Sequence, residues 1–212
     1  MEIALTVRNV VIIGGMMPSK FDKYFFLKNN IFNEGDILET SQFSNEFSLT
    51  ITPNYSVQIA AGQFILTELK PDAEGDIENV ARRILECSDD FEATGVGVNI
   101  QWFNFTRENT RELSKKYFFN SNLLINKFFD GADTSYGYYI SKNFGKARLK
   151  LDIKPAKVVK VGTTVEDEIL TFTFNFHVDL LKEQKSKAQI IEVLQEIEDY
   201  TLETKKIVDA FD

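Results

Sequence analysis

The stretch EILTFTFNFHVDLLKEQKSKAQIIEVLQEIEDYTLETKKIVDAFD, residues 168–212, decides the fold. Its first part alternates apolar and polar side chains, with six apolar positions from Leu170 to Leu180 on one face, which is typical of a half-buried antiparallel strand. Its second part, from Ile190 to Phe211, repeats apolar residues at helical spacing. We therefore expect one long C-terminal helix whose apolar stripe covers a sheet that includes the preceding strand.

Upstream of this stretch, the same two kinds of pattern recur. Residues 2–88 predict a strand, a helix, three strands and a helix, and residues 94–211 predict a strand, a helix, three or four strands and a helix. We expect an α+β fold: a mostly antiparallel sheet covered by helices on one layer. The order of elements favours two tandem β-α-β-β-β-α halves, residues 1–90 and 91–212, packed closely or sharing one sheet. The alternative is a single sheet that is punctuated in this way by chance.

Three local details sharpen this expectation. Residues 55–69 predict one strand with a bulge near Gly62, because the inward-facing set of side chains changes parity there. Thr106 is expected to cap a helix that runs to about Phe119. Pro155 is expected to interrupt the strand that begins near Lys146.

The composition supports a packed core and limits the classes of partner. Of the 212 residues, 43% are hydrophobic and 13% aromatic. The net charge of −8 argues against general binding to nucleic acid or an anionic membrane. No run approaches the about 20 apolar residues of a membrane helix, and Cys87, the only cysteine, excludes an internal disulfide. We expect a soluble cytoplasmic protein of a bacterium or phage, without a signal peptide.

Positive charge is concentrated in one predicted hairpin, where it is interleaved with aromatic side chains. Such a face can bind an acidic protein surface, or it can hold single-stranded nucleic acid by neutralising phosphates and stacking bases. Lysines on a solvated sheet edge, which guard it against pairing, are the simplest interpretation. Among the functional interpretations we favour protein contact over nucleic acid. The candidate binding residues are Lys142, Lys146, Arg148, Lys150, Lys154 and Tyr138.

His177 is the only histidine, so any histidine-based catalysis must use it. Asp179 follows on the same face of the strand, and together the two residues could form a general base oriented by a carboxylate. A solvated or helix-covered strand residue is the simpler interpretation.

The loop at residues 130–135 offers Asp130 and Asp133 as oxygen ligands for calcium or magnesium. It lacks the length and the closing glutamate of an EF-hand loop, and an ordinary turn explains it as well. We therefore expect no metal site.

The sequence contains no phosphate-binding loop, nucleophile elbow or other specific catalytic motif, so we expect no cofactor and lean away from an enzyme. The leading hypothesis is a non-catalytic binding or assembly protein that acts through protein–protein contacts and self-association. The alternative is a small-ligand binder, with an apolar cavity between a curved sheet and the long helix. An enzyme that uses His177 is the third hypothesis.

Overall fold

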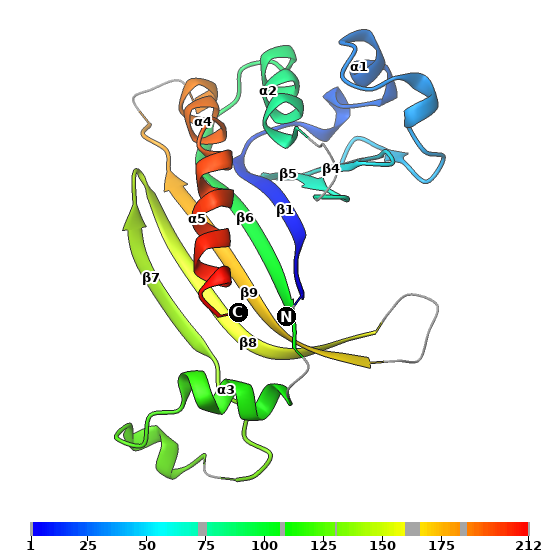
Figure 1. The fold of residues 1–212 in the computed structure, drawn as a ribbon. Helices are drawn as coiled ribbons and strands as arrows, with labels where there is room; N and C mark the ends of the chain where they lie inside the picture. Colours follow the sequence, from blue (N-terminus) through cyan, green and yellow to red (C-terminus); the bar gives the residue numbers. More distant parts are fainter. Residues whose placement is uncertain are drawn as a thin grey trace.

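The computed structural model describes the chain except for residues 1, 72–75, 107–108, 130, 160–165, 183–185 and 212, and the side chain of residue 126. Across the described residues the backbone forms one antiparallel sheet of nine strands, in the order β2-β3-β4-β5-β1-β6-β9-β8-β7, together with five α-helices (Figure 1). The expected α+β class and the mostly antiparallel sheet are confirmed.

The strands follow the period-two pattern of apolar residues along the sequence. Their bounds are β1 (Glu2–Gly14), β2 (Gln42–Phe43), β3 (Phe47–Ile51), β4 (Tyr55–Ala60), β5 (Gln63–Glu68), β6 (Ala93–Phe105), β7 (Tyr138–Phe144), β8 (Ala147–Val159) and β9 (Glu166–Asp179).

The first three helices begin at polar residues, Asp22, Asp76 and Asn109, whose side chains accept hydrogen bonds from backbone N–H groups of the first turn. The helices are α1 (Lys23–Lys28), α2 (Ile77–Cys87), α3 (Thr110–Phe118), α4 (Ser186–Leu194) and α5 (Ile197–Asp209). Short 3₁₀ turns lie at Pro18–Lys20, Glu34–Asp36 and Leu124–Lys127.

The core lies between the helices and one face of the sheet. Val10, Val98, Phe176 and Leu149 sit side by side across β1, β6, β9 and β8, and all four are buried. Burying each such side chain contributes about 1.5–3 kcal/mol. The alternation predicted for residues 170–180 therefore decides which face of β9 enters the core.

The helices contact the sheet on this same face (Figure 1). In β6, Trp102 Nε1 donates a hydrogen bond to Thr204 Oγ1 of α5 at 2.9 Å. In β3, Ser48 Oγ donates to the backbone carbonyl of Phe21, just before α1, at 2.5 Å. Strand register places Trp102 and Ser48 on the face that carries the core row. The opposite face, called here the helix-free face, carries no helix within the described residues.

The expectation of one long C-terminal helix is wrong. α4 and α5 are separate helices, interrupted at Gln195 and Glu196. There the N–H of Glu196 bonds to the carbonyl of Val193, three residues back, at 3.2 Å. This tighter turn interrupts the α-helical hydrogen-bond ladder, although the apolar stripe continues from one helix into the next.

The expectation of one bulged strand over residues 55–69 is also wrong. β4 and β5 form an antiparallel hairpin in which Ala60 pairs with Gln63. Gly62 adopts φ +77°, a conformation that glycine reaches without steric cost, so it closes the tight turn. The change of parity in the sequence therefore marks this turn. Because residues 55–69 form two strands, α1 is followed by four strands instead of the expected three.

Two boundary expectations fail for identifiable reasons. The cap of α3 is Asn109, not Thr106, because the Asn109 side chain accepts from the N–H groups of Arg111 and Glu112. Pro155 does not interrupt β8. β7 begins at Tyr138, opposite Ile153, so the part of β8 after Ile153 pairs with β9 alone among the described strands, and a proline is tolerated on such an edge.

Candidate functional site

The pleat of the sheet divides the predicted basic surface between two faces. Lys142 of β7 lies on the core side, where Nζ bonds to Glu203 Oε1 of α5 at 3.0 Å. Lys146, in the turn between β7 and β8, bonds to Glu192 Oε2 of α4 at 2.7 Å. These two lysines therefore contact the acidic side of the chain's own C-terminal helices.

The remaining basic candidates project from the helix-free face. The Arg148 guanidinium donates to Asn143 Oδ1 at 3.0 Å and also contacts Ser141. Lys154 pairs with Asp152 at 2.9 Å, and Lys150 is exposed beside them. The structure thus does not bring the predicted residues into one site. Tyr138 lies elsewhere, stacked on Phe118 of α3 at 6.0 Å between ring centroids.

His177 and Asp179 are in contact, with 3.0 Å between Nε2 and Oδ1. The carboxylate is 93% exposed, so water competes for it and the interaction is weak. In the neighbouring strand β6, Gly95 pairs with Asp179 and Gly97 pairs with His177. A Cβ atom on Gly95 would lie 3.0 Å from His177 Cε1. The two glycines therefore make room for the imidazole ring, and a catalytic role for His177 stays a prediction.

Of the two weak metal candidates, Asp130 lies outside the described residues and Asp133 is exposed in a loop. Within the part of the chain that the structure describes, no group of three or more His, Cys, Asp or Glu side chains could hold a metal ion. No described helix is long and apolar enough to cross a membrane.

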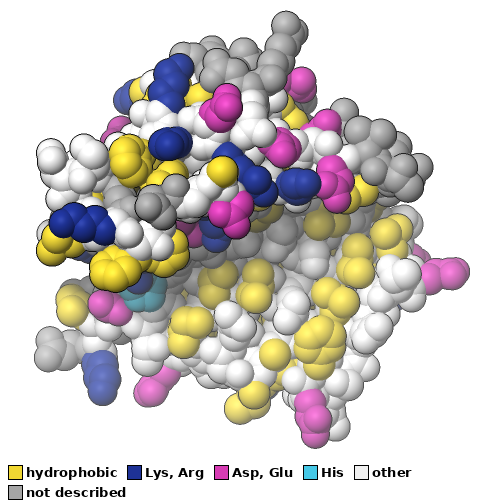
Figure 2. All heavy atoms as spheres, turned by 90° about the horizontal axis from the view of Figure 1, so that it is seen from below, with side chains coloured by type: hydrophobic (Ala, Val, Ile, Leu, Met, Phe, Trp, Pro, Cys, Tyr) yellow, Lys and Arg dark blue, Asp and Glu magenta, His cyan; other side chains and the backbone are white. Residues whose placement is uncertain are grey.

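An exposed apolar segment follows α3 and projects below the sheet (Figure 1). We call residues 119–129 the apolar arm; Leu124 in it is 73% exposed and Phe128 is 81% exposed. In Figure 2, which views this lower end, hydrophobic side chains gather on the near surface around this segment. The exposed large apolar residues of the arm and of β7 are Phe119, Leu123, Leu124, Ile125, Phe128, Phe129, Tyr138, Tyr139 and Ile140.

Aromatic contacts join the apolar arm to the start of β7. The Tyr136 ring packs edge-on against Phe119 at 5.3 Å, and its hydroxyl donates to the backbone carbonyl of Phe129 at 2.8 Å. β7 is the last strand of the sheet, so one side of its backbone faces no other described strand. The arm and this open edge form one surface, called here the arm–edge surface.

Sequence reasoning missed the arm–edge surface. Residues 118–129 read FFNSNLLINKFF, a dense set of apolar residues, but the run is too short for its periodicity to assign a helix or a strand. The sequence signal for this surface is a set of large apolar side chains that shows neither helical nor strand periodicity, so no regular element is predicted to bury them.

A pocket of about 690 Å³ lies between α4, α5 and the turn that joins β7 to β8. Tyr200 and Phe144 contribute aromatic rings to it, and carboxylates approach it from α4, from the junction between α4 and α5, and from β9. Its lining residues are Phe144, Gly145, Lys146, Val178, Asp179, Leu180, Leu181, Gln189, Glu192, Val193, Gln195, Glu196 and Tyr200. We call this cavity the helix pocket.

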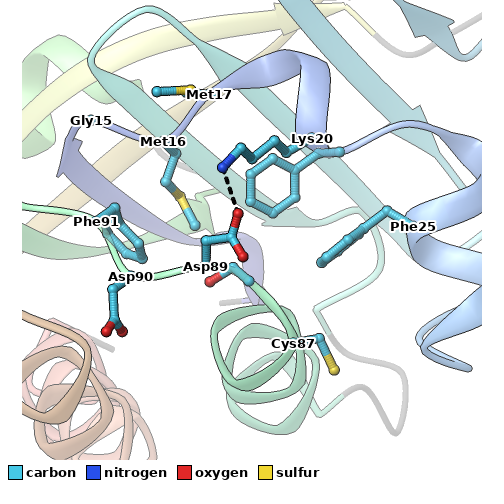
Figure 3. Close-up of a pocket in the computed structure, with 11 residues that line it drawn as sticks. Gly15, Met16, Met17, Lys20, Phe25, Cys87, Asp89, Asp90 and Phe91 are labelled. Carbon is cyan, nitrogen blue, oxygen red and sulfur yellow. Dashed lines mark hydrogen bonds and ion pairs between the residues drawn. The ribbon is translucent and has the colours of Figure 1, made fainter.

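A smaller pocket of about 360 Å³ lies between the 3₁₀ turn before α1 and the end of α2 (Figure 3). Lys20 Nζ and Asp89 Oδ2 form an ion pair in it at 2.5 Å. The hydrogen bond and charge of Lys20 lower the pKa of Asp89 below its ordinary value. Met16 and Phe91 lie to one side, while the Cys87 side chain lies apart from the ion pair.

Comparison with known proteins identifies no relative: no family model, no curated protein and no solved structure matches this chain. The functional inference therefore rests on the geometry of the chain itself.

Proposed function

We propose that this chain is a binding and assembly protein that self-associates through the arm–edge surface. The observation that carries the proposal is the exposure of large apolar side chains beside an open edge strand. Leu124 and Phe128 expose most of their surface, and Tyr139 and Ile140 are exposed on β7 itself. Contiguous apolar patches of this kind mark interaction sites on soluble proteins.

The partner that best fits this surface is a second copy of the chain. β7 spans Tyr138–Phe144, contains no proline and has one lysine, Lys142, which already pairs with Glu203. Such a strand lacks the usual protection against edge pairing. At the other end of the sheet, β2 is only two residues long, so that edge is blunted.

Two copies related by a twofold axis would pair β7 with β7 in antiparallel fashion and bring their apolar arms together. A twofold contact uses the same patch on both subunits, which requires a self-complementary surface. An antiparallel strand pair meets this requirement through backbone hydrogen bonds, and the aromatic residues supply an apolar interface core.

The tandem organisation is part of the same proposal. The strand order is β2-β3-β4-β5-β1 and then β6-β9-β8-β7, so each half would place its first strand at the centre, its last strand beside it and its second strand at the edge of the sheet. This order supports two related halves, residues 1–90 and 91–212, joined across β1 and β6. The cytoplasmic location and the bacterial or phage origin stay predictions.

Native mass spectrometry and light scattering of the purified chain test self-association. We expect a dimer for the wild type, and a dissociation constant at least about tenfold weaker for the double variant Leu124→Asp/Phe128→Asp. Ile140→Lys should weaken it as well, by placing a charge on the edge. Tyr24→Asp, at an exposed aromatic residue of α1, is the matched control and should leave the dimer unchanged.

A wild-type chain that stays monomeric at high concentration would contradict the proposal. So would a dimer that the control variant weakens as much as the arm variants do. Circular dichroism of each variant separates a lost interface from a lost fold.

A further inference from the structure

The helix pocket has a rigid aromatic wall. The Tyr200 ring stacks on Phe176, with 4.1 Å between centroids and 5° between planes. Phe144 packs edge-on against both rings, at 5.9 Å from Tyr200 and 5.7 Å from Phe176. Because Phe176 is fully buried, this wall is held by the core of the protein.

The opposite wall, Leu180 and Leu181, is fixed by hydrogen bonds to the backbone. Gln189 of α4 accepts from the N–H of Leu181 at 2.8 Å and donates to its carbonyl at 3.0 Å. The N–H of Leu180 bonds to the carbonyl of Thr94 at 3.0 Å. Both walls are therefore formed before any ligand arrives, which lowers the entropic cost of binding.

The Tyr200 hydroxyl is a polar group without a partner among the described residues. The side chain is buried, with the residue 3% exposed, and it lines the helix pocket. Burial, with a smaller contribution from Glu196, raises the pKa of this hydroxyl to about 12, so it stays neutral. The hydroxyl faces the pocket, so a ligand bound there can form a hydrogen bond with it.

The charges around the helix pocket favour a cation. Asp179, Glu192 and Glu196 contribute three carboxylates, while Lys146 contributes one ammonium group that is already bonded to Glu192 at 2.7 Å. The excess of negative charge repels anionic ligands. It attracts the ammonium group of an amine.

We propose that the helix pocket binds a small organic amine with an apolar body, an alkylamine or arylalkylamine. Its volume of about 690 Å³ lies within the range of small-molecule sites, about 300–1,000 Å³. The apolar body packs between Leu181 and the aromatic wall, the ammonium group lies toward Glu196, and Tyr200 supplies a hydrogen bond. Phe144 at the end of β7 lines the helix pocket, but none of the exposed apolar residues of the arm–edge surface does, so this inference does not rest on self-association.

Isothermal titration with four probes tests the proposal: hexylamine and phenethylamine, with hexanol and hexanoate as uncharged and anionic counterparts. We expect saturable binding of the two amines, and no binding of hexanoate. Glu196→Gln removes the charge of the carboxylate and should weaken amine binding about tenfold, and Tyr200→Phe removes one hydrogen bond and should weaken it about fivefold. Leu181→Trp, at an exposed pocket residue, should block binding, whereas Leu202→Trp, at an exposed position of α5 outside the pocket, should not.

Absence of amine binding to the folded wild type would overturn the proposal. So would equal affinity for hexylamine and hexanoate, or equal effects of Leu181→Trp and Leu202→Trp. The same titration on Leu124→Asp/Phe128→Asp distinguishes the two ideas, since amine binding should persist when self-association is lost.

Discussion

The ring of Tyr200 in α5 lies parallel to the ring of Phe176 in β9, 4.1 Å away. The two residues belong to the stretch that decides the fold, and their stacking joins its helical part to its strand. Offset-stacked and edge-to-face aromatic pairs contribute about 0.5–1.5 kcal/mol beyond the burial of their surface. This contact is therefore a principal link between the C-terminal helices and the sheet, and it also forms one wall of the helix pocket.

Replacing Tyr200 tests this link. Tyr200→Ala removes the ring and should lower the free energy of unfolding by about 3–5 kcal/mol. Tyr200→Phe keeps the ring and removes only a hydroxyl that has no described partner, so its effect should stay below about 1 kcal/mol. Urea denaturation followed by circular dichroism measures both values. A small loss for Tyr200→Ala would show that the stacking does not anchor α5.

The hydrogen bond from Trp102 Nε1 to Thr204 Oγ1 gives a second prediction. Both residues are buried, so Thr204→Val leaves the indole N–H without an acceptor and should cost about 1–3 kcal/mol. Thr201→Val is the matched control, because the Thr201 hydroxyl bonds within its own helix, to the carbonyl of Ile197 at 2.8 Å. The prediction fails if both variants unfold at the same urea concentration. Trp102 is the only tryptophan, so its fluorescence reports the change directly.

Asn104 in β6 is fully buried, and neither atom of its amide group has a hydrogen-bond partner. Burying an unpaired amide costs stability, so Asn104→Leu should raise the free energy of unfolding by about 1–3 kcal/mol. Asn99→Leu should instead lower it, because Asn99 donates to Asn9 Oδ1 at 2.8 Å and accepts from Asn175 Nδ2 at 2.7 Å. Thermal denaturation of the two variants measures both effects. Equal losses of stability in Asn104→Leu and Asn99→Leu would contradict the assignment of Asn104 as an unpaired buried amide.

Glu168 of β9 binds the start of α3 and predicts a dependence of stability on pH. Its Oε2 accepts from the backbone N–H of Thr110 at 3.1 Å and from the Thr110 hydroxyl at 2.9 Å. These hydrogen bonds, the backbone one first, lower the pKa of Glu168 below its ordinary value of 4.5. The lowered pKa means that the folded state favours the ionised carboxylate.

The stabilisation from Glu168 is therefore complete above the unfolded-state pKa and is lost as the pH falls through the lower folded-state pKa. Thermal unfolding from neutral pH down to pH about 3 should show the wild type more stable than Glu168→Gln at neutral pH. The difference should shrink with acidification. A difference that is independent of pH would show that the carboxylate charge does not contribute.

Within residues 168–212, the sequence could predict which residues of the strand face the core. The alternation from Leu170 to Leu180 depends only on the two-residue period of a strand, and the structure buries Phe172, Phe174 and Phe176 as that period requires. The helix at Ile77 is explained in the same way by helical spacing. These patterns are local, so they can be read without knowledge of distant contacts.

The functional surfaces could not be predicted in this way. The basic hairpin was expected to form one binding face, but Lys142 and Lys146 pair with Glu203 and Glu192, residues 61 and 46 positions away. Such pairings depend on the order of strands in the sheet, which local periodicity does not encode. Likewise, the apolar arm is exposed because no described element packs over it. Local periodicity does not encode this either.

The sequence by itself determined the fold class, the antiparallel character of the sheet and the buried face of its main strands, because each follows from the spacing of apolar residues along a few turns or pleats. Only the tertiary structure decided that Tyr200 meets Phe176, that Leu181 is fixed by Gln189 and that the apolar arm lies beside β7. Those relationships arise where separate elements dock, and docking is governed by packing between surfaces that are distant in sequence.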